Sequence, residues 1–219
     1  MLCRFAAVSL AVVALSSPLD AQLTTPSHWR WITDAPAQLV TGQDVPDSAW
    51  RFVTMPPGWH VTTGPGAILF DPTVRAQGRF GIEAEVFLFP DSENGEFGLF
   101  FGGTELDGSQ RRYSAFVLRR DGMAAVYVQD GATRRSIVPW TVSDAVKPHP
   151  GSGTLKHVLG IDVEPRAVTF RVNGETVVTV PRDRLPAEGA IGFRAGANVN
   201  LHWSTLDVTF RLAEPRPQR

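Results

Sequence analysis

Cysteine is almost absent from this sequence, which limits how the fold can be held together. The one cysteine, Cys3, stands ahead of an apolar run at the N-terminus. A disulfide joins two cysteines, so none can form within the chain. Because Cys3 precedes the apolar run instead of following it, it cannot be the lipid-carrying cysteine of a lipoprotein. The folded protein must therefore be stabilised by a hydrophobic core.

An excess of charge of either sign is also missing. Lys and Arg together number 21 and Asp and Glu 22, so the net charge is −1, and the charged residues are dispersed along the chain. Nucleic acids and anionic membrane surfaces are bound by clustered positive charge. The sequence therefore predicts neither of these partners.

Long apolar runs are confined to the N-terminus. Arg4 precedes the apolar residues 5–15, Pro18 then breaks any helix, and Ala21 offers a small residue for cleavage. A bilayer span needs roughly 20 apolar residues, whereas this order is typical of an export signal peptide. We predict a signal peptide over residues 1–21, no membrane span in the processed chain, and a secreted or periplasmic location. A buried N-terminal helix is the alternative.

Amphipathic helices of ten or more residues are not found in the sequence, and strand-like patterns take their place. Over residues 80–89 every second side chain from Phe80 onward is apolar, whereas Gly81 and Glu83 stand between them. Side chains on a strand point alternately to opposite faces, so this pattern predicts a strand with one buried face. Residues 167–173 show the same alternation. We predict an all-β fold of two antiparallel sheets packed as a sandwich.

Composition divides the chain into parts. Residues 22–57 are rich in Pro, Thr, Asp and Trp and have no sustained period, which predicts an irregular lead-in with short strands, such as residues 50–54, that pack on the sandwich. The β-sandwich is expected over residues 58–212, a length that commonly forms one all-β domain. Residues 213–219 are polar and are expected to be a frayed tail.

Turn residues mark three hairpins. Asp121-Gly122, Asp130-Gly131 and Asn173-Gly174 each separate two apolar runs. Such pairs readily adopt the positive φ angles that tight antiparallel hairpins need. In the last strand the alternation of apolar residues changes parity at residues 204–205, which predicts a β-bulge there.

Several strand sequences together carry a family resemblance. They are GLFF at residues 98–101, YSAFVL at 113–118, VNG at 172–174 and GAIGFRA at 189–195. In this order they resemble the concanavalin A-like lectin/glucanase superfamily, and within it the laminin-G-like exported bacterial modules, over residues 59–212. The resemblance implies a jelly-roll sandwich. Its members include lectins, glycosidases and adhesion modules, so it does not decide the activity.

Glu83 and Glu85 are the candidate catalytic residues if the protein is an enzyme. They share one face of the predicted strand, with Cα atoms roughly 6.5–7 Å apart. The jelly-roll glucanases that the fold resembles carry three acids on alternate positions, but the third position here is Phe87. A glycosidase needs two carboxylates with distinct roles. We therefore predict no catalytic residue, and we interpret these two glutamates as part of a solvated or partly covered strand face.

Metal ligands are sparse. The loop over residues 91–96 gathers acidic oxygens, and Asp91 and Glu93 are weak calcium candidates because calcium prefers oxygen ligands. The five histidines show no metal-binding spacing. His157 shares parity with apolar neighbours and is expected to be partly buried and hydrogen-bonded. We expect no other cofactor.

Aromatic residues supply the remaining indication of a ligand. The sequence has six tryptophans, of which Trp50 and Trp203 are expected in the core. Sugar rings stack on exposed aromatic faces while nearby polar groups bind the hydroxyls. The candidate ligand-binding residues are Trp59, His60, Glu85, Tyr113, Arg119 and Trp140.

These observations favour an exported, non-enzymatic β-sandwich module that binds carbohydrate or another extracytoplasmic ligand. A glycoside hydrolase that acts on oligosaccharides through Glu83 or Glu85 is the first alternative. A structural or adhesion module with a protein ligand is the second. The sequence leaves the identity of the ligand and the oligomeric state open.

Overall fold

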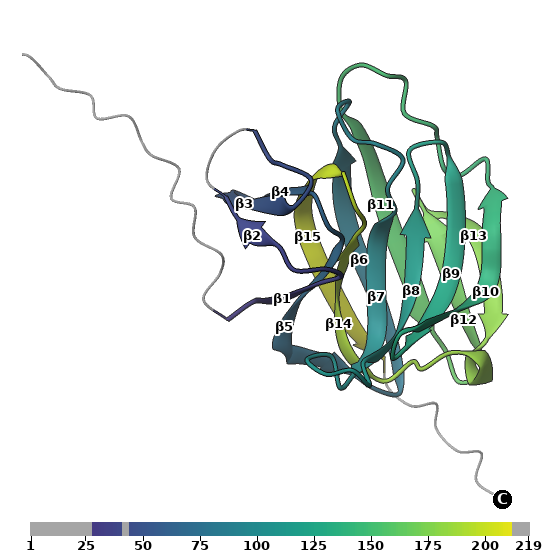
Figure 1. Ribbon diagram of the computed structural model, residues 1–219. Coiled ribbons are helices and arrows are strands. Elements are labelled where there is room, and N and C mark those ends of the chain that lie inside the picture. Colours follow the sequence, from purple (N-terminus) through teal and green to yellow (C-terminus); the bar gives the residue numbers. More distant parts are fainter. Residues whose placement is uncertain (1–27, 41–43, 212–219) are drawn as a thin grey trace, which may run out of the picture.

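The described residues of the computed structural model, 28–40 and 44–211, form two stacked β-sheets (Figure 1). The seven-stranded sheet has the order β1 (Arg30–Thr33), β5 (Ala67–Ala76), β14 (Gly189–Ala195), β7 (Phe97–Thr104), β8 (Arg112–Leu118), β9 (Met123–Asp130) and β10 (Thr133–Val142). The eight-stranded sheet has the order β13 (Glu175–Pro181), β12 (Ala167–Val172), β11 (Leu155–Val163), β6 (Arg79–Leu88), β15 (Asn200–Arg211), β4 (Gly58–Thr63), β3 (Ala49–Met55) and β2 (Gln38–Leu39).

The predicted all-β sandwich is confirmed. Neighbouring strands pair antiparallel except for β2 and β3, which run parallel. The one helical segment among the described residues is the short 3₁₀ helix η1 (Arg182–Arg184). In the part of the chain that the structure describes, no helix has the length and apolar character needed to cross a membrane. The predicted signal peptide and the predicted tail after residue 212 lie outside the described residues.

Strand β6 shows why these residues form a sheet. Phe80, Ile82, Ala84, Val86 and Leu88 are buried, and the residues between them are half-buried or exposed. This is the alternation predicted from the sequence. Burying one large apolar side chain contributes about 1.5–3 kcal/mol, and the strands together bury many of them between the sheets.

An aromatic cluster joins the two sheets and the N-terminal segment. Phe193 on β14 stacks on Trp203 of β15, with ring centroids 4.2 Å apart. Trp29, just before β1, lies 5.5 Å from Phe193 and 4.7 Å from Trp59 on β4. Trp50 and Trp203 are each 1% exposed, so their predicted place in the core is confirmed. The described part of the segment before residue 58 contributes β1, β2 and β3.

The predicted hairpins and bulge are also confirmed. Gly122, Gly131 and Gly174 all have positive φ angles and connect β8 to β9, β9 to β10 and β12 to β13. The register between β15 and β6 shifts between Trp203 and Thr205. One extra residue at this point lets both halves of β15 direct apolar side chains inward.

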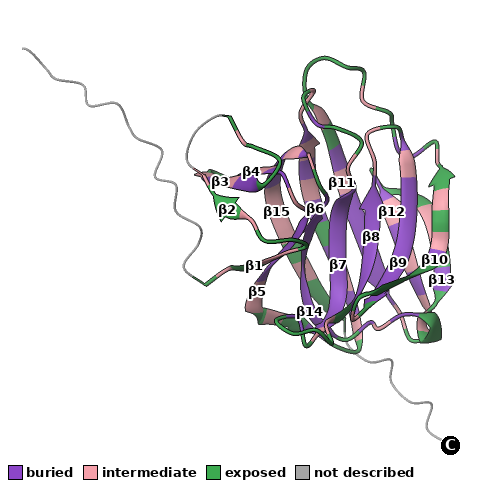
Figure 2. Cartoon of the chain, in the orientation of Figure 1, coloured by how far each residue is buried: buried purple, intermediate pink, exposed green. Residues whose placement is uncertain are grey.

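The outer faces of the two sheets differ in character (Figure 2). Strand β6 of the eight-stranded sheet alternates between buried and accessible residues, so the outer face of this strand is exposed to solvent. Nearly every residue of β7, β8 and β9 is buried, which means that both faces of these strands are covered. The seven-stranded sheet therefore carries a second packed layer on its outer face, away from the sandwich core.

Candidate functional site

The second layer begins with a group of aromatic side chains. Tyr113 of β8 lies between Phe100 of β7 and Tyr127 of β9, with ring centroids 5.4 Å and 6.4 Å away. These rings belong to an apolar cluster separate from the core between the sheets, and Ile32 and Trp140 pack against it. The centre of the outer face is thus apolar, and polar groups are arranged above and beside it.

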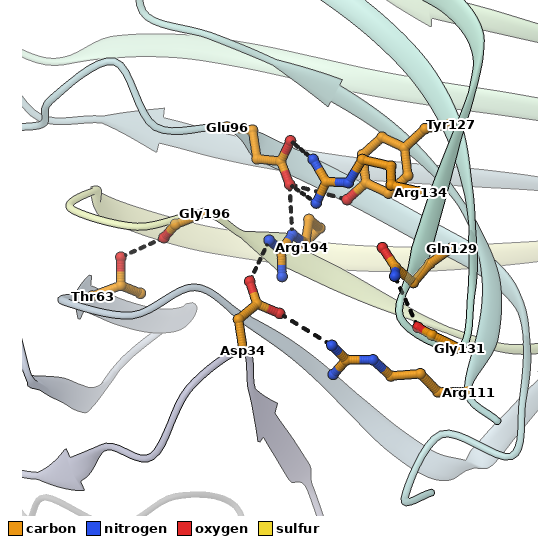
Figure 3. A network of polar contacts seen from close by, with 10 residues as sticks. All are labelled: Asp34, Thr63, Glu96, Arg111, Tyr127, Gln129, Gly131, Arg134, Arg194 and Gly196. Carbon is orange, nitrogen blue, oxygen red and sulfur yellow. Dashed lines mark hydrogen bonds and ion pairs between the residues drawn. The ribbon is translucent and has the colours of Figure 1, made fainter. Parts of the chain in front are cut away.

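Glu96, just before β7, is the centre of these polar groups (Figure 3). Arg134 of β10 donates from Nη1 to Oε2 at 2.9 Å and from Nη2 to Oε1 at 3.0 Å. Arg194 of β14 donates from Nε to Oε1 at 2.8 Å. The hydroxyl of Tyr127 donates to the same oxygen at 3.0 Å. A single carboxylate thus connects three strands of the sheet.

The ion pairs continue from Arg194 toward the N-terminal edge of the sheet. Nη2 of Arg194 donates to Oδ2 of Asp34 at 2.6 Å. Oδ1 of Asp34 lies 3.8 Å from Nη2 of Arg111, in the loop before β8. We call Asp34, Glu96, Arg111, Arg134 and Arg194 the arginine network. It holds three guanidinium groups and two carboxylates, so it carries one net positive charge.

Burial and charge set the protonation of this network. Burial alone would raise the pKa of the Glu96 carboxyl, but the charges of Arg194 and Arg134 and their hydrogen bonds outweigh it, so this pKa lies below its ordinary value. Burial raises the pKa of Tyr127 well above its usual range, so the phenol stays protonated and donates to Glu96. At neutral pH the Glu96 carboxyl is therefore ionised while the Tyr127 phenol is neutral.

A half-open hollow of about 230 Å³ adjoins the network. Its lining residues are Ala125, Val126, Tyr127, Arg134, Ser136, Val138, Pro139 and Trp140. The Arg134 guanidinium carbon lies 3.9 Å from the centroid of the Tyr127 ring. That of Arg119 lies 4.5 Å from the Trp140 ring. The lining of the hollow thus combines the rings of Tyr127 and Trp140 with the guanidinium group of Arg134, and we call it the Trp140 hollow.

A wider depression of about 600 Å³ opens near η1, at the end of the sandwich. Arg112, Arg166 and Arg182 line it, but no aromatic ring does. Arg182 there is bound by Glu188 at 2.7 Å. Since sugar rings are bound largely through aromatic faces, the Trp140 hollow is the better candidate.

The predicted ligand-binding residues are divided between different surfaces. Tyr113, Arg119 and Trp140 belong to the outer face of the seven-stranded sheet, and Tyr113 is fully buried there. Trp59 points between the sheets, where it packs against Trp29 and Phe193. The predicted residues therefore do not form one site, because strand alternation places Trp59 in the interior.

The other predicted residues lie on the outer face of the eight-stranded sheet. His60 of β4 pairs with His202 across the strands and packs edge-on against Phe89. Glu85 of β6 forms an ion pair with Lys156 of β11. Glu83, on the same face of β6, stands across from Gly160. These glutamates are thus on the opposite side of the molecule from the Trp140 hollow.

The calcium candidates are hydrogen-bonded within the protein. Both carboxylate oxygens of Asp91 accept from Nδ2 of Asn200, and Glu93 accepts from Nδ2 of Asn198 at 3.0 Å. Within the described ranges, no group of three or more His, Cys, Asp or Glu side chains is placed to hold a metal ion. Calcium binding at this rim stays a prediction.

None of the five residues of the arginine network, nor Tyr127, was predicted from the sequence as a site residue, although Glu96 ends the acidic loop over residues 91–96. Arg194 follows Phe193 in GAIGFRA, so strand alternation directs it away from the core side chains Ile191 and Phe193. Arg194 is nevertheless 3% exposed. An arginine within a run of buried residues, next to the uninterrupted apolar strands β7 to β9, is the signal that could have indicated a covered face.

No protein-family model and no curated protein sequence matches the chain. Solved structures do resemble it. A carbohydrate-binding module, CBM66 from Bacillus subtilis, aligns with a TM-score of 0.59 at 10% identity, over 73% of this chain and 91% of the module. A Bacteroides ovatus mixed-linkage glucan GH16 protein, in complex with a G4G4G3G product, aligns with a TM-score of 0.57 at 8% identity, over 86% and 98%. An endo-β-1,3-glucanase from Pyrococcus furiosus aligns with a TM-score of 0.56 at 10% identity, over 83% and 87%.

Identities this low bear on the fold alone. The structures that align include both a carbohydrate-binding module and a glucanase, so the architecture is shared by proteins of different activity. Two stacked antiparallel sheets, their strand order and these neighbours agree with one another. The chain thus has the two-sheet jelly-roll β-sandwich fold that these structures share.

Proposed function

We propose that this protein binds carbohydrate in the Trp140 hollow and does not cleave it. The observation that carries the proposal is the hollow itself, in which a half-buried tryptophan lies beside Tyr127, Arg134 and Ser136. A sugar ring has an apolar face that packs on an aromatic ring and hydroxyls that need directional hydrogen bonds. The likeness of fold to a carbohydrate-binding module supports the same assignment.

The carboxylates near the hollow argue against hydrolysis. A glycosidase needs one carboxylic acid with a raised pKa, which protonates the leaving group, and a second carboxylate. Glu96 has a lowered pKa and is bound by two arginines. Asp34 is bound by Arg194. Glu96 is therefore held as an anion and is a poor proton donor, Asp34 is occupied by its ion pair with Arg194, and Glu83 and Glu85 lie on the other sheet.

The location of the protein bears on the source of the sugar. The predicted signal peptide over residues 1–21 supports export, so we place the protein in the periplasm or outside the cell. An exported binding module meets polysaccharides of the envelope or of the surroundings. The fold needs no disulfide in that environment, because its core is large and continuous.

Calorimetry on the processed protein, guided by a glycan array, tests the proposal. Trp140→Ala removes the ring that lines the hollow, and we expect it to weaken sugar binding at least about tenfold, since such stacking contributes on the order of 1.4 kcal/mol or more. Trp31→Ala is the matched control, because Trp31 is also a partly exposed tryptophan but lies on β1.

Three results would contradict the proposal. One is equal loss of binding in both variants, and another is binding that Glu85→Ala abolishes and Trp140→Ala leaves intact. The third is the absence of binding to every glycan, which would favour a protein ligand.

A further inference from the structure

Arg134 is held in place before any ligand arrives. Its two terminal nitrogens are bound to the two oxygens of Glu96, and its planar group lies over the Tyr127 ring. Glu96 thus holds the edge of the guanidinium and Tyr127 holds its face, which removes most of the rotational freedom of the Arg134 side chain. A ligand that binds here therefore does not have to order it, which lowers the entropic cost of binding.

The same guanidinium keeps donors for a ligand. A guanidinium has five N–H groups, and the bonds to Glu96 use two of them. The Arg134 side chain is 43% exposed although Glu96 is almost completely buried, so its free donors face the solvent side of the network. Arg134 can thus bind a second acceptor while Glu96 holds it.

The electrostatics of the surroundings favour an anion as that acceptor. No acidic side chain lines the hollow among the described residues, and Arg134 is the one charged residue in its lining. The arginine network has one guanidinium more than it has carboxylates. Its donors also exceed its acceptors, since Nη1 of Arg194 is buried without a hydrogen-bond partner among the described residues. A neutral sugar would leave the excess positive charge unpaired.

We infer that the ligand is an acidic saccharide, and that Arg134 binds the carboxylate of a uronic acid unit whose ring packs on Trp140. This inference rests on the proposed function and names its ligand class. A carboxylate is planar and can accept two parallel hydrogen bonds from one edge of a guanidinium. Glu96 occupies the edge formed by the two terminal nitrogens of Arg134, so the ligand would take the edge formed by Nε–H and the second N–H of a terminal nitrogen. A sulfate ester also carries a negative charge, but its oxygens are arranged tetrahedrally and do not match the planar guanidinium as a carboxylate does.

The first test uses the unmodified protein and varies the ligand. Calorimetry compares a uronic acid tetrasaccharide, its methyl ester and the neutral tetrasaccharide of the same linkage. We expect the free acid to bind at least about tenfold more tightly than either neutral form, because only the free acid forms a charge-assisted hydrogen bond with Arg134. The advantage should shrink as salt rises, because the charges are partly exposed.

The second test varies the arginine. Arg134→Gln should abolish the preference for the free acid, and Arg134→Lys should recover less than half of it because lysine lacks the fork. Arg135→Gln is the matched control, since Arg135 is the next residue on β10 and donates instead to the carbonyl of Arg184. It should bind as the unmodified protein does.

The outcomes separate this inference from the proposed function. Equal binding of acid, ester and neutral sugar, with loss in Trp140→Ala, would overturn the inference and leave carbohydrate binding intact. Binding of a sulfated oligosaccharide without binding of the uronate would also overturn it. Absence of all sugar binding would overturn both. If Arg134→Gln fails to fold, the comparison of acid and ester on the unmodified protein decides.

Discussion

His157 of β11 is buried beside Phe97, with ring centroids 5.9 Å apart, and Nδ1 has no hydrogen-bond partner among the described residues. It is more deeply buried than its expected partial burial. Burial lowers its pKa to about 4, because the charged imidazolium would lose its hydration. The imidazole is thus neutral in the folded protein throughout the physiological range.

Acid should destabilise the protein through this residue. In the unfolded chain the pKa is near 6.5, so the unfolded state takes up a proton first as pH falls. The contribution of neutral His157 is fully present above pH 6.5 and is lost progressively down to about pH 4, at a rate of up to about 1.4 kcal/mol per pH unit. Urea unfolding at pH 7, 5.5 and 4.5 measures this loss.

His157→Phe supplies the comparison, since an aromatic ring without a titrating nitrogen fits the same apolar surroundings. Its free energy of unfolding should fall less steeply over the same range. His60 and His202, whose pKa values burial also lowers, titrate in both proteins and cancel in the difference. Parallel pH profiles for the two proteins would show that His157 is not the group responsible.

Glu96 is the carboxylate partner of two arginines, Arg134 and Arg194, on the outer face of the seven-stranded sheet. Glu96→Gln leaves the buried Arg194 with one carboxylate partner and should lower the free energy of unfolding by about 3 kcal/mol. Glu83→Gln, a change of the same chemistry at an exposed position of β6, should cost less than about 0.5 kcal/mol. Chemical denaturation of both variants checks the difference, and equal losses would mean that the network does not stabilise the fold.

At the scale of elements, two hairpin glycines offer a matched pair. Gly122 and Gly174 both have φ of 85°. A Cβ on Gly174 would meet nothing within 4 Å, but one on Gly122 would lie 3.0 Å from the Val146 carbonyl oxygen. Gly174→Ala should therefore cost about 1 kcal/mol through backbone strain alone, and Gly122→Ala more. Equal melting temperatures for the two variants would contradict the crowding at Gly122.

The elements themselves could be predicted because their causes are local. Alternation identified β6 and β12, and turn pairs identified the hairpins after β8, β9 and β12. The uninterrupted apolar runs in β7, β8 and β9 also carried information, since a strand without alternation is buried on both faces. That pattern would have indicated which sheet has a covered outer face.

The site itself could not be predicted in the same way, because its contacts join distant parts of the chain. Arg194 meets Glu96 across 98 positions of sequence and Asp34 across 160. Their juxtaposition depends on strand order, which alternation does not specify. Glu85 and Trp140 were each suitable as a ligand-binding residue by residue type, but the fold places them on the outer faces of different sheets.

At the scale of the whole molecule, the sandwich separates two roles. The core between the sheets and the aromatic cluster of Trp29, Trp59, Phe193 and Trp203 hold the sheets together. The solvent-exposed outer face of the eight-stranded sheet carries ion pairs such as that between Glu85 and Lys156. The outer face of the seven-stranded sheet carries the arginine network and the Trp140 hollow, where we propose that the ligand binds.

The most direct measurement is the mapping of amide and indole NMR shifts on titration with a uronic acid tetrasaccharide. Binding in the Trp140 hollow should give the largest changes at the Trp140 indole, at Tyr127 and along β10, while β6 and β11 change little. Shifts concentrated around Glu85 and Lys156, or no saturable shifts with any sugar, would contradict it.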